Sequence, residues 1–491
     1  MTFGSPRDIA EVGFNGLAQF ANGFTLNRFG IDSDGTREAA IFGGNTSDDP
    51  QELLPNLSVT FAQDQGVFGP PILLAGEEDI VELIASVEMD SENNLHAFSS
   101  RVANSGSTPP QIHALNASGD GATVGEPIPL APNIEPGMAQ LFSNSTMDAG
   151  DGLHFVFSTL SAESENVTGP IYYVRSDDHG ATWSVPKAVV GISGSPQNSF
   201  LYPSVVTSPD GETVVVSYFD VDQVQIRSAK SVDGGASFSS NVEVFEFPYP
   251  PNAIFSKVAM DASGKIYVVY SADTDGDQIS EILLSSSDDG SSYGQPVTVN
   301  LESTNFEGSI VNMAIDSRGR IDVIWHSDPD DDDLPQILNF ARSTDGGATF
   351  SSPVTIATAP ADELVMNGGI RHDRWGHVFI NYIFTNLDVL SEQPPSGSIF
   401  MLVGTPDDVG SPESCDDGSD NDFDGAIDCD DTECEGDGAC VDDSGIGGEA
   451  EGGGCSIGVR STKLGWAALF PATGLLFLLL QRRKARASSR A

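Results

Sequence analysis

Acidic residues in the segment 420–431, DNDFDGAIDCDD, are spaced like the ligands of a calcium-binding loop. Such loops hold Ca²⁺ with oxygen atoms from positions one, three, five, nine and twelve and with the backbone carbonyl of position seven. Gly425 stands at position six, where the loop turns sharply, and apolar Ile427 at position eight. The spacing predicts bound calcium, and an unliganded acidic spacer is the alternative. The predicted ligands are Asp420, Asp422, Asp424, Ala426, Asp428 and Asp431.

All five cysteines follow residue 414, and four of them lie in one acidic, glycine-rich segment. This clustering favours two disulfides formed in an oxidising compartment, with three pairings open. Zinc is the alternative, but the segment has no C-x-x-C pair and no nearby histidine. The seven histidines of the chain show no metal-ligand spacing either, and we expect them to be structural. The cysteines are Cys415, Cys429, Cys434, Cys440 and Cys455.

The charge of the chain excludes one class of partner. It has 72 acidic and 22 basic residues, a formal net charge of −50. A nucleic-acid duplex would repel such a body, so we expect no nucleic-acid partner. No Lys or Arg occurs from Trp375 to Val459, whereas the last 32 residues contain seven, and this asymmetry marks a domain boundary.

An eight-residue polar pattern recurs between runs of β-forming residues. Its four clear copies, SDDHGATW, SVDGGASF, SSDDGSSY and STDGGATF, are spaced by 55, 55 and 57 residues. Weaker copies precede and follow them at a similar step. A period near 55 residues indicates a repeated supersecondary unit. The clear copies begin at Ser176, Ser231, Ser286 and Ser343, and the weaker ones at Ala62, Ser118 and Thr405.

Each unit contains four short runs rich in Val, Ile and aromatic residues, separated by turns such as Asp-Gly. This pattern is typical of a four-stranded antiparallel blade. Blades repeated radially form a β-propeller, so the predicted fold is all-β over residues 7–410. We count seven strand sets and predict seven blades, with six as the alternative. The last set lacks a convincing fourth strand after Val403, and we expect residues 8–14, DIAEVGF, to supply it and close the ring.

The spacing S-x-D-x-G-x-[TS]-[WFY] between third and fourth strands resembles the Asp-box of the BNR-repeat, sialidase-like propellers. The resemblance covers roughly residues 7–410. In such a box the glycine supplies a positive φ, the Asp accepts hydrogen bonds from turn amides, and the aromatic is buried between blades. A residue that occurs once in every blade cannot also be a unique catalytic group. We therefore expect the boxes to be structural.

The same resemblance implies a possible exo-sialidase. Such an enzyme needs three arginines converging on the substrate carboxylate, a Tyr nucleophile assisted by Glu, and an Asp acid/base. Many also carry Arg-Ile-Pro near the start, but here Arg28 is followed by Phe-Gly. The other candidates, Arg37, Arg101 and Arg227, suggest no clear triad. We favour ligand binding without turnover and keep a sialidase-like exo-glycoside hydrolase as the alternative, with its catalytic residues unknown.

The connections between blades, and those between second and third strands, should gather on the face opposite the boxes. Acids and aromatics there could bind a neutral or cationic glycan, a protein, or a calcium ion held by the carboxylates. Solvated loop acids are the alternative. The predicted ligand-binding residues are Tyr202, Tyr249, Asp220, Asp273, Glu307 and Asp328.

After the propeller the composition changes. Residues 411–441 are similar to Cys- and Asp-rich modules of bacterial surface proteins, and residues 442–454 read as a flexible linker. The apolar run Leu464–Leu480 would span roughly 25 Å as a helix, near the lower limit for a membrane crossing, and the basic residues after it would stay cytoplasmic. A buried soluble helix is the alternative.

The tail of residues 455–491 resembles a MYXO-CTERM-type bacterial sorting signal. That resemblance implies export to the cell envelope or outer surface, anchoring by the apolar segment, and Cys455 as the processing or lipid-attachment site. The first residues, MTFGSPRDIAEVGF, contain no apolar signal-peptide region. We therefore expect the natural start to lie upstream of this Met.

Overall fold

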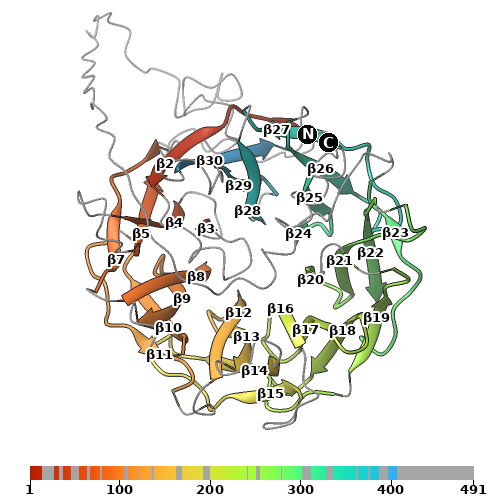
Figure 1. The fold of residues 1–491 in the computed structure, drawn as a ribbon, viewed down its shortest axis with the longest axis horizontal. Helices are drawn as coiled ribbons and strands as arrows, with labels where there is room; N and C mark the ends of the chain where they lie inside the picture. Colours follow the sequence, from red (N-terminus) through yellow and green to blue (C-terminus); the bar gives the residue numbers. More distant parts are fainter. Residues whose placement is uncertain are drawn as a thin grey trace, which may run out of the picture.

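The computed structural model places seven antiparallel sheets in a ring, so the chain is a seven-bladed β-propeller (Figure 1). The prediction of seven blades is confirmed, and the six-bladed alternative is wrong. We number the blades 1 to 7 in the order of their innermost strands. The structure describes residues 1–13, 27–31, 37–45, 55–63, 67–77, 80–103, 109–119, 121–132, 134, 138–161, 168–191, 200–239, 241–249, 251, 255–277, 279–300, 311–327, 335–360, 363–373, 376–385 and 396–405.

The strands run outward from the centre in sequence order within blades 1 to 6, and in blade 7 the N-terminal strands lie outside the last three. The innermost strands are β3 (Asn27–Ile31), β8 (Ile80–Met89), β12 (Met138–Met147), β16 (Phe200–Thr207), β20 (Ser256–Met260), β24 (Val311–Ile315) and β28 (Leu364–His372). The second strands are β4 (Arg37–Asn45), β9 (Leu95–Ala103), β13 (Leu153–Ser161), β17 (Val214–Asp220), β21 (Ile266–Ala272), β25 (Ile321–Ser327) and β29 (Val378–Thr385).

The third strands carry the repeated boxes at their ends. They are β5 (Pro55–Gln63), β10 (Gln111–Ala117), β14 (Thr168–Ser176), β18 (Gln225–Ser231), β22 (Glu281–Ser287), β26 (Ile337–Ser343) and β30 (Ser396–Thr405). The outer edges are formed by β6 (Val67–Phe68) and β7 (Ile72–Ala75), β11 (Ile128–Pro129), β15 (Lys187–Val190), β19 (Val242–Glu246), β23 (Val297–Thr298) and β27 (Val354–Thr358), with β1 (Thr2–Phe3) and β2 (Arg7–Gly13) in blade 7.

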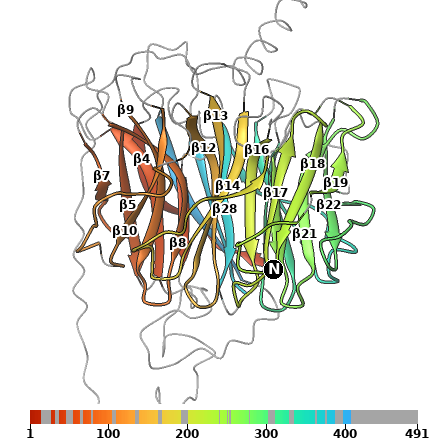
Figure 2. The ribbon, with the colours of Figure 1, turned by 90° about the horizontal axis from the view of Figure 1, so that it is seen from below.

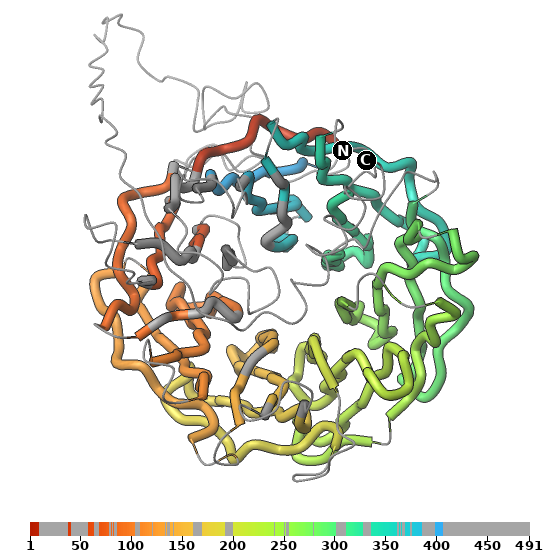
Figure 3. Tube along the Cα trace, in the orientation of Figure 1, coloured from red at the N-terminus to blue at the C-terminus, as the bar shows by residue number. Residues whose placement is uncertain are grey.

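The N-terminal segment closes the ring. Strand β2 pairs antiparallel with β30, with Asp8 opposite Phe400 and Val12 opposite Gly397. Figure 3 shows the beginning of the chain beside the end of its described part. The predicted closing strand is thereby confirmed, and pairing the first strand with the last removes a free sheet edge.

The second strands form the middle of every blade and are the most buried. All seven residues of β17 and of β21 are buried. Each second strand is flanked by strands on both sides and covered by neighbouring blades on both faces. Its amino-acid sequence is therefore a nearly continuous apolar run. Trp325 of β25 and Tyr267 of β21, for example, share one core between blades 5 and 6.

The boxes are closed hydrogen-bond circuits. In blade 3 the amide of Gly180 donates to Ser176 Oγ at 2.9 Å, and the amide and hydroxyl of Thr182 donate to the two oxygens of Asp178 at 2.8 and 2.6 Å. Blades 4 and 6 repeat these bonds. The box aromatic packs on the preceding blade, as Trp183 does on Phe98 with ring centroids 5.7 Å apart. The boxes therefore have the expected structural role.

The box of blade 5 differs from the sequence alignment by one residue. Ser287, and not Ser286, is the last residue of β22 and accepts the amide of Gly290 at 2.8 Å. Asp289 then accepts the amide and hydroxyl of Ser291 at 2.8 and 2.7 Å. This box is one residue shorter between its serine and its glycine than the other three, so a different Ser and Asp complete the turn.

The predictions for the tail concern residues that the structure does not describe. The calcium loop with Asp420, Asp422, Asp424, Ala426, Asp428 and Asp431, the five cysteines including Cys455, and the apolar run 464–480 all lie outside the described residues. Within the described part of the chain, no helix is long and apolar enough to cross a membrane.

Candidate functional site

The two ends of the propeller differ in which connections they carry. In blade 3, Met147 pairs with Leu153 and Leu153 with Ser176, so the first turn and the box lie at the same end. We call this end of the ring the box-turn face. The opposite end, where the inner strands begin and the second strands finish, is the link face. Figure 2 shows the strands running between these two faces.

Three aromatic rings from consecutive blades form a continuous row at the inner strands. The ring of Tyr202 lies 4.5 Å from that of Phe142 on one side and 4.5 Å from that of Phe255 on the other. Each residue lies five positions before the last residue of its inner strand, so all three stand at one level. All three are half-buried. We call Phe142, Tyr202 and Phe255 the aromatic row.

Two members of the aromatic row have strained backbones. Phe142 has a φ of 47° and Tyr202 a φ of 53°, in a region that bulky residues rarely adopt. Both stand at register shifts, between Leu141 and Ser143 in β12 and between Leu201 and Ser204 in β16. A bulge of this kind redirects a side chain, and such strain is concentrated at functional sites.

Sequence reasoning selected Tyr202 but missed Phe142 and Phe255. A signal was present, because each of the three stands six residues before the first residue of the turn between first and second strands. Those turn residues are Asp148, Ser208 and Asp261. Alignment of the units on this turn, and not on the box, puts the three aromatics in one column.

A polar layer lies two residues further along the same strands. Asn144 Oδ1 accepts Lys257 Nζ at 3.1 Å and the amide of Val205 at 3.1 Å. Ser204 Oγ lies 3.5 Å from the same oxygen. We call Asn144, Ser204 and Lys257 the polar layer. It places one ammonium group and two hydrogen-bonding side chains next to the aromatic row.

The structure brings together only some of the predicted rim residues. Tyr249 is 42% exposed and lies over Gly276, where an added Cβ would meet the ring at 2.8 Å. Gly276 belongs to the loop of Asp273, whose Oδ1 accepts its amide at 2.6 Å. Tyr249 and the Asp273 loop are therefore neighbours. Glu307 and Asp328 lie outside the described residues.

Two carboxylates toward the link face are buried. Asp220, at the end of β17, accepts the amide of Gln223 at 3.1 Å, and burial raises its pKa. Glu82, near the start of β8, accepts the Ser99 hydroxyl and, at 2.7 Å, Arg101 Nε. Burial raises the pKa of Glu82 more than these bonds lower it. Asp220 is thus a buried acid at the link-face end of its blade, and its role as a ligand-binding residue stays a prediction.

Six arginines with described side chains are each paired with a carboxylate of the protein. Arg342, for example, binds both oxygens of Asp322 at 2.7 and 2.6 Å, and Arg371 lies 3.0 Å from Glu88. The triad implied by the sialidase resemblance is not formed by these six. They are Arg7, Arg101, Arg175, Arg320, Arg342 and Arg371.

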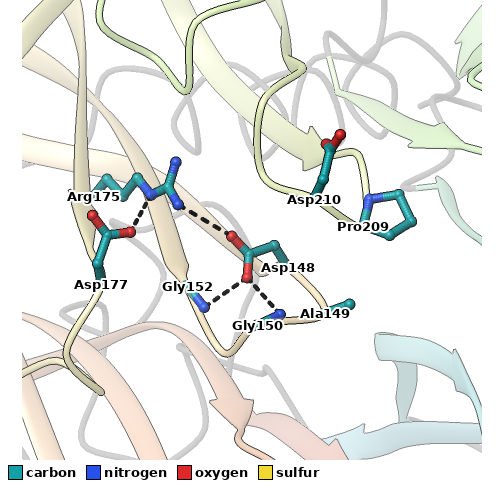
Figure 4. A pocket seen from close by; sticks show the side chains of 8 residues that line it. All are labelled: Asp148, Ala149, Gly150, Gly152, Arg175, Asp177, Pro209 and Asp210. Atoms are coloured by element: carbon teal, nitrogen blue, oxygen red, sulfur yellow. Dashed lines mark hydrogen bonds and ion pairs between the residues drawn. The ribbon is translucent and has the colours of Figure 1, made fainter.

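A pocket of about 400 Å³ opens between blades 3 and 4 on the box-turn face (Figure 4). Arg175 lies across it and contacts Asp177 at 2.5 Å and Asp148 at 3.5 Å. Asp148 Oδ1 also accepts the amides of Gly150 and Gly152 at 2.9 and 2.8 Å. Because the guanidinium is already engaged by two carboxylates, this pocket is poorly suited to an anionic sugar. The aromatic row and polar layer are the stronger candidate site.

Comparison with known proteins places the chain among repeat propellers. Residues 40–364 match the model of the BNR repeat-like domain. None of the curated proteins compared with the chain matches it.

Two similar solved structures are of an ulvan lyase of polysaccharide lyase family PL25, one of them bound to -[GlcA(1-4)Rha3S]-. Each is 12% identical and covers 80% of this chain and 95% of its own, with TM-scores of 0.51 and 0.52. The intramolecular trans-sialidase from Ruminococcus gnavus, in complex with oseltamivir carboxylate, is 12% identical with a TM-score of 0.43, covering 81% of this chain and 98% of its own. At such identities the likeness shows the fold alone.

Proposed function

Because the chain belongs to the BNR repeat-like domain family, we propose that it is an exported, surface-anchored propeller that binds an extracellular ligand, a carbohydrate in preference to a protein, without turning it over. The observation that carries this proposal is the aromatic row on the inner strands of blades 3 to 5. Three rings at one level, two of them on strained backbone, supply a surface of the kind that ligand sites use.

The chemistry of the row suits a sugar ring. A pyranose has an apolar face of C–H groups, which packs on aromatic rings, and an edge of hydroxyl groups, which needs hydrogen-bond partners. The polar layer supplies hydrogen-bonding groups from Asn144 and Lys257, whereas Ser204 is buried and accepts the amide of Val258 at 3.3 Å. Lys257 adds a positive charge, so we expect a preference for sugars that carry a carboxylate or sulfate.

The structural comparison supports a carbohydrate over a protein ligand. An ulvan lyase that has a similar fold was solved with -[GlcA(1-4)Rha3S]- bound. Its chain is 12% identical to this one, so the likeness supports the class of ligand and no individual residue.

A sialidase-like exo-glycoside hydrolase is the alternative function. It would require arginines that are free to converge on a sialoside carboxylate. Six of the described arginines are held in ion pairs within the protein, which favours binding over catalysis. Turnover of a fluorogenic sialoside by the purified chain, abolished by an arginine substitution, would establish the alternative and refute the proposal.

The test of the proposed function is a glycan array that includes ulvan oligosaccharides, sialosides and neutral glycans, with and without calcium. Tyr202→Asn removes the central ring of the aromatic row, and Asn tolerates the positive φ at this position. We expect it to weaken binding at least about tenfold, which corresponds to about 1.4 kcal/mol. Val232→Ala, which shortens an exposed apolar side chain in the box of the same blade, is the control. Equal binding by wild type and Tyr202→Asn would show that the row is not the site.

The proposed calcium binding and membrane anchoring are functions of the tail and are separate from ligand binding by the propeller. We propose that the loop from Asp420 to Asp431 binds Ca²⁺ and that residues 455–491 direct the chain to the cell envelope through Cys455. Residues 405–491 fused to a reporter test the second point in a host with the matching sorting system. A reporter that stays in the cytoplasm would count against surface anchoring and would leave the binding proposal intact.

A further inference from the structure

A carboxylate and two imidazoles meet on the box-turn face, where blade 2 adjoins blade 3. Asp90 Oδ2 lies 3.1 Å from His96 Nε2 and 2.9 Å from His179 Nδ1, and all three atoms lie within 4.8 Å of one another. Asn94 Nδ2 also approaches Asp90 Oδ2, at 3.1 Å. Asp90 and His96 are buried, and the side chain of His179 is 44% exposed. His96 and His179 stand 83 positions apart, which explains why no ligand spacing appears in the sequence.

His179 stands where the other boxes favour glycine. It is the fourth residue of its box, and Gly234 and Gly346 hold that position in blades 4 and 6, both with positive φ. His179 has a φ of 53°, which costs a residue with a Cβ roughly 1–2 kcal/mol. The strained backbone of His179 thus places an imidazole of blade 3 beside Asp90 of blade 2.

The hydrogen bonds around His96 fix which of its nitrogens carries the proton. Asn116 Nδ2 donates to the carbonyl of Gly180 at 3.2 Å, so Asn116 Oδ1 is the atom that faces His96 Nδ1, at 3.0 Å. A carboxamide oxygen can only accept, so His96 Nδ1 must be the protonated nitrogen. Neutral His96 therefore directs the lone pair of Nε2 at the carboxylate oxygen of Asp90, 3.1 Å away. Two electron-rich atoms at this distance repel each other unless a cation or a further proton lies between them.

Blade 3 provides an internal comparison. There His154 Nε2 lies 3.1 Å from Asp148 Oδ2, in the same positions of the same turn. The other nitrogen, His154 Nδ1, faces the hydroxyl of Tyr173 at 2.7 Å, and this hydroxyl can donate either to Nδ1 or to the carbonyl of Gly234 at 3.3 Å. When it donates to Nδ1, the shorter of the two contacts, His154 carries its proton on Nε2 and donates to Asp148 with no additional group. In blade 2 the partner of Nδ1 is an oxygen that can only accept, and His179 of blade 3 adds a third ligand atom.

We propose that Asp90, His96 and His179 bind a zinc ion that links blade 2 to blade 3. Two imidazole nitrogens and one carboxylate oxygen form a common ligand set of Zn²⁺, and ligands about 2.0–2.1 Å from the metal stand roughly 3.3 Å apart in a tetrahedron. The separations of 3.1 and 2.9 Å are close to this value. Asn116 holds His96 in the required tautomer, as the outer partners of zinc-bound histidines do. The exposed side of His179 leaves room for water as the fourth ligand.

The test is zinc titration of the full chain by calorimetry after chelator treatment, with the five cysteines alkylated because thiolates would bind zinc themselves. His179→Gly is the decisive variant, because glycine suits the backbone at this position and the variant should fold. We expect wild type to bind one zinc ion per chain more than His179→Gly. His326→Gln, a half-buried histidine of β25, should bind zinc as wild type does.

A second variant tests the outer partner. Asn116→Ala leaves the three ligands in place but removes the hydrogen bond that fixes the tautomer of His96. We expect zinc affinity to fall about 10- to 100-fold. Equal zinc stoichiometry in wild type and His179→Gly would overturn the proposal. So would nitrogen NMR spectra of His96 that show a proton on Nε2 in the presence of saturating zinc at pH 8, because the imidazolium would then account for the contact with Asp90.

Discussion

The pKa values of carboxylates on the two faces of the propeller are shifted in opposite directions. On the box-turn face, hydrogen bonds from Ser237 and Ser231 lower the pKa of Asp233 to about 2, and those from Thr349 lower the pKa of Asp345 to about 2. Toward the link face, burial raises the pKa of Asp220 and of Glu82. The box acids are exposed and accept several hydrogen bonds each, whereas Asp220 and Glu82 are buried and accept fewer hydrogen bonds.

This difference separates architecture from recognition. Each box Asp accepts hydrogen bonds from the amide and hydroxyls of its own turn, as Asp178 does in blade 3, so the repeated acids serve the turn. The aromatic row occurs in blades 3 to 5, and two of its members carry a strained backbone that the box does not require. We infer that the repeat builds the ring and that departures from the repeat provide function.

The largest expected effect concerns the packing of a box. Gly235 has a φ of 84°, and an added Cβ would lie 2.1 Å from the ring of Tyr173. We expect Gly235→Ala to cost about 2–4 kcal/mol of unfolding free energy, from backbone strain and overpacking together. Gly264→Ala is the control, because its φ is 86° and nothing lies within 4 Å. Equal losses in urea unfolding of both variants would show that the contact with Tyr173 contributes nothing.

The next effect concerns the polar layer and should appear in binding. We expect Lys257→Met to reduce affinity for carboxylated or sulfated glycans about tenfold, or about 1.4 kcal/mol, because it removes the cation beside the aromatic row. Affinity for neutral glycans should change little. Titrations with one acidic and one neutral oligosaccharide of equal length measure the difference, and an equal decrease for both would contradict the assignment of Lys257.

A smaller effect distinguishes two adjacent serines of blade 5. Ser287→Ala removes the acceptor of the Gly290 amide and should cost about 1 kcal/mol. Ser286→Ala, at the position that the sequence pattern selects, should change stability by less than about 0.5 kcal/mol. Chemical unfolding of both variants decides between the two registers of this box, and the reverse order would restore the sequence alignment.

The smallest effect is the pH dependence of the two faces. The folded-state pKa of Asp220 lies above its unfolded value of about 3.9. Its contribution to stability is therefore present below that value and is lost as the pH rises through the folded pKa. The stability of Asp220→Asn relative to wild type should therefore rise between pH 4 and pH 7. Melting temperatures across this range measure the gain, and a constant difference would contradict it.

The box acids should show the opposite trend. Because the pKa values of Asp233 and Asp345 are lowered to about 2, their contribution is present above pH 4 and is lost as the pH falls toward 2. Asp345→Asn should therefore flatten the acid limb of the stability curve of wild type. An unchanged acid limb would show that other carboxylates control it.

Much of the fold could be predicted because its signals are local. The 55-residue step, the Asp-Gly turns and the short runs rich in Val, Ile and aromatic residues predict the blades, and a missing fourth strand after Val403 predicts closure by residues 8–14. The candidate site was harder to predict from the sequence. Tyr202 was selected from its position in a link, but Phe142 and Phe255 stand within units whose boxes gave no reason to single them out.

The sequence by itself determined the repeat and the box turns of blades 3, 4 and 6, because each box depends on residues within about ten positions of one another. The number of blades followed from counting that repeat along residues 7–410. Only the tertiary structure decided which side chains meet across blades, since those contacts depend on bulges, on a one-residue difference in a turn and on the angle between adjacent sheets. The aromatic row spans residues 142–255, and the site of Asp90, His96 and His179 spans residues 90–179. The aromatic row becomes visible in the sequence only when the units are aligned on the turn between first and second strands, and the residues of the second site have no regular spacing.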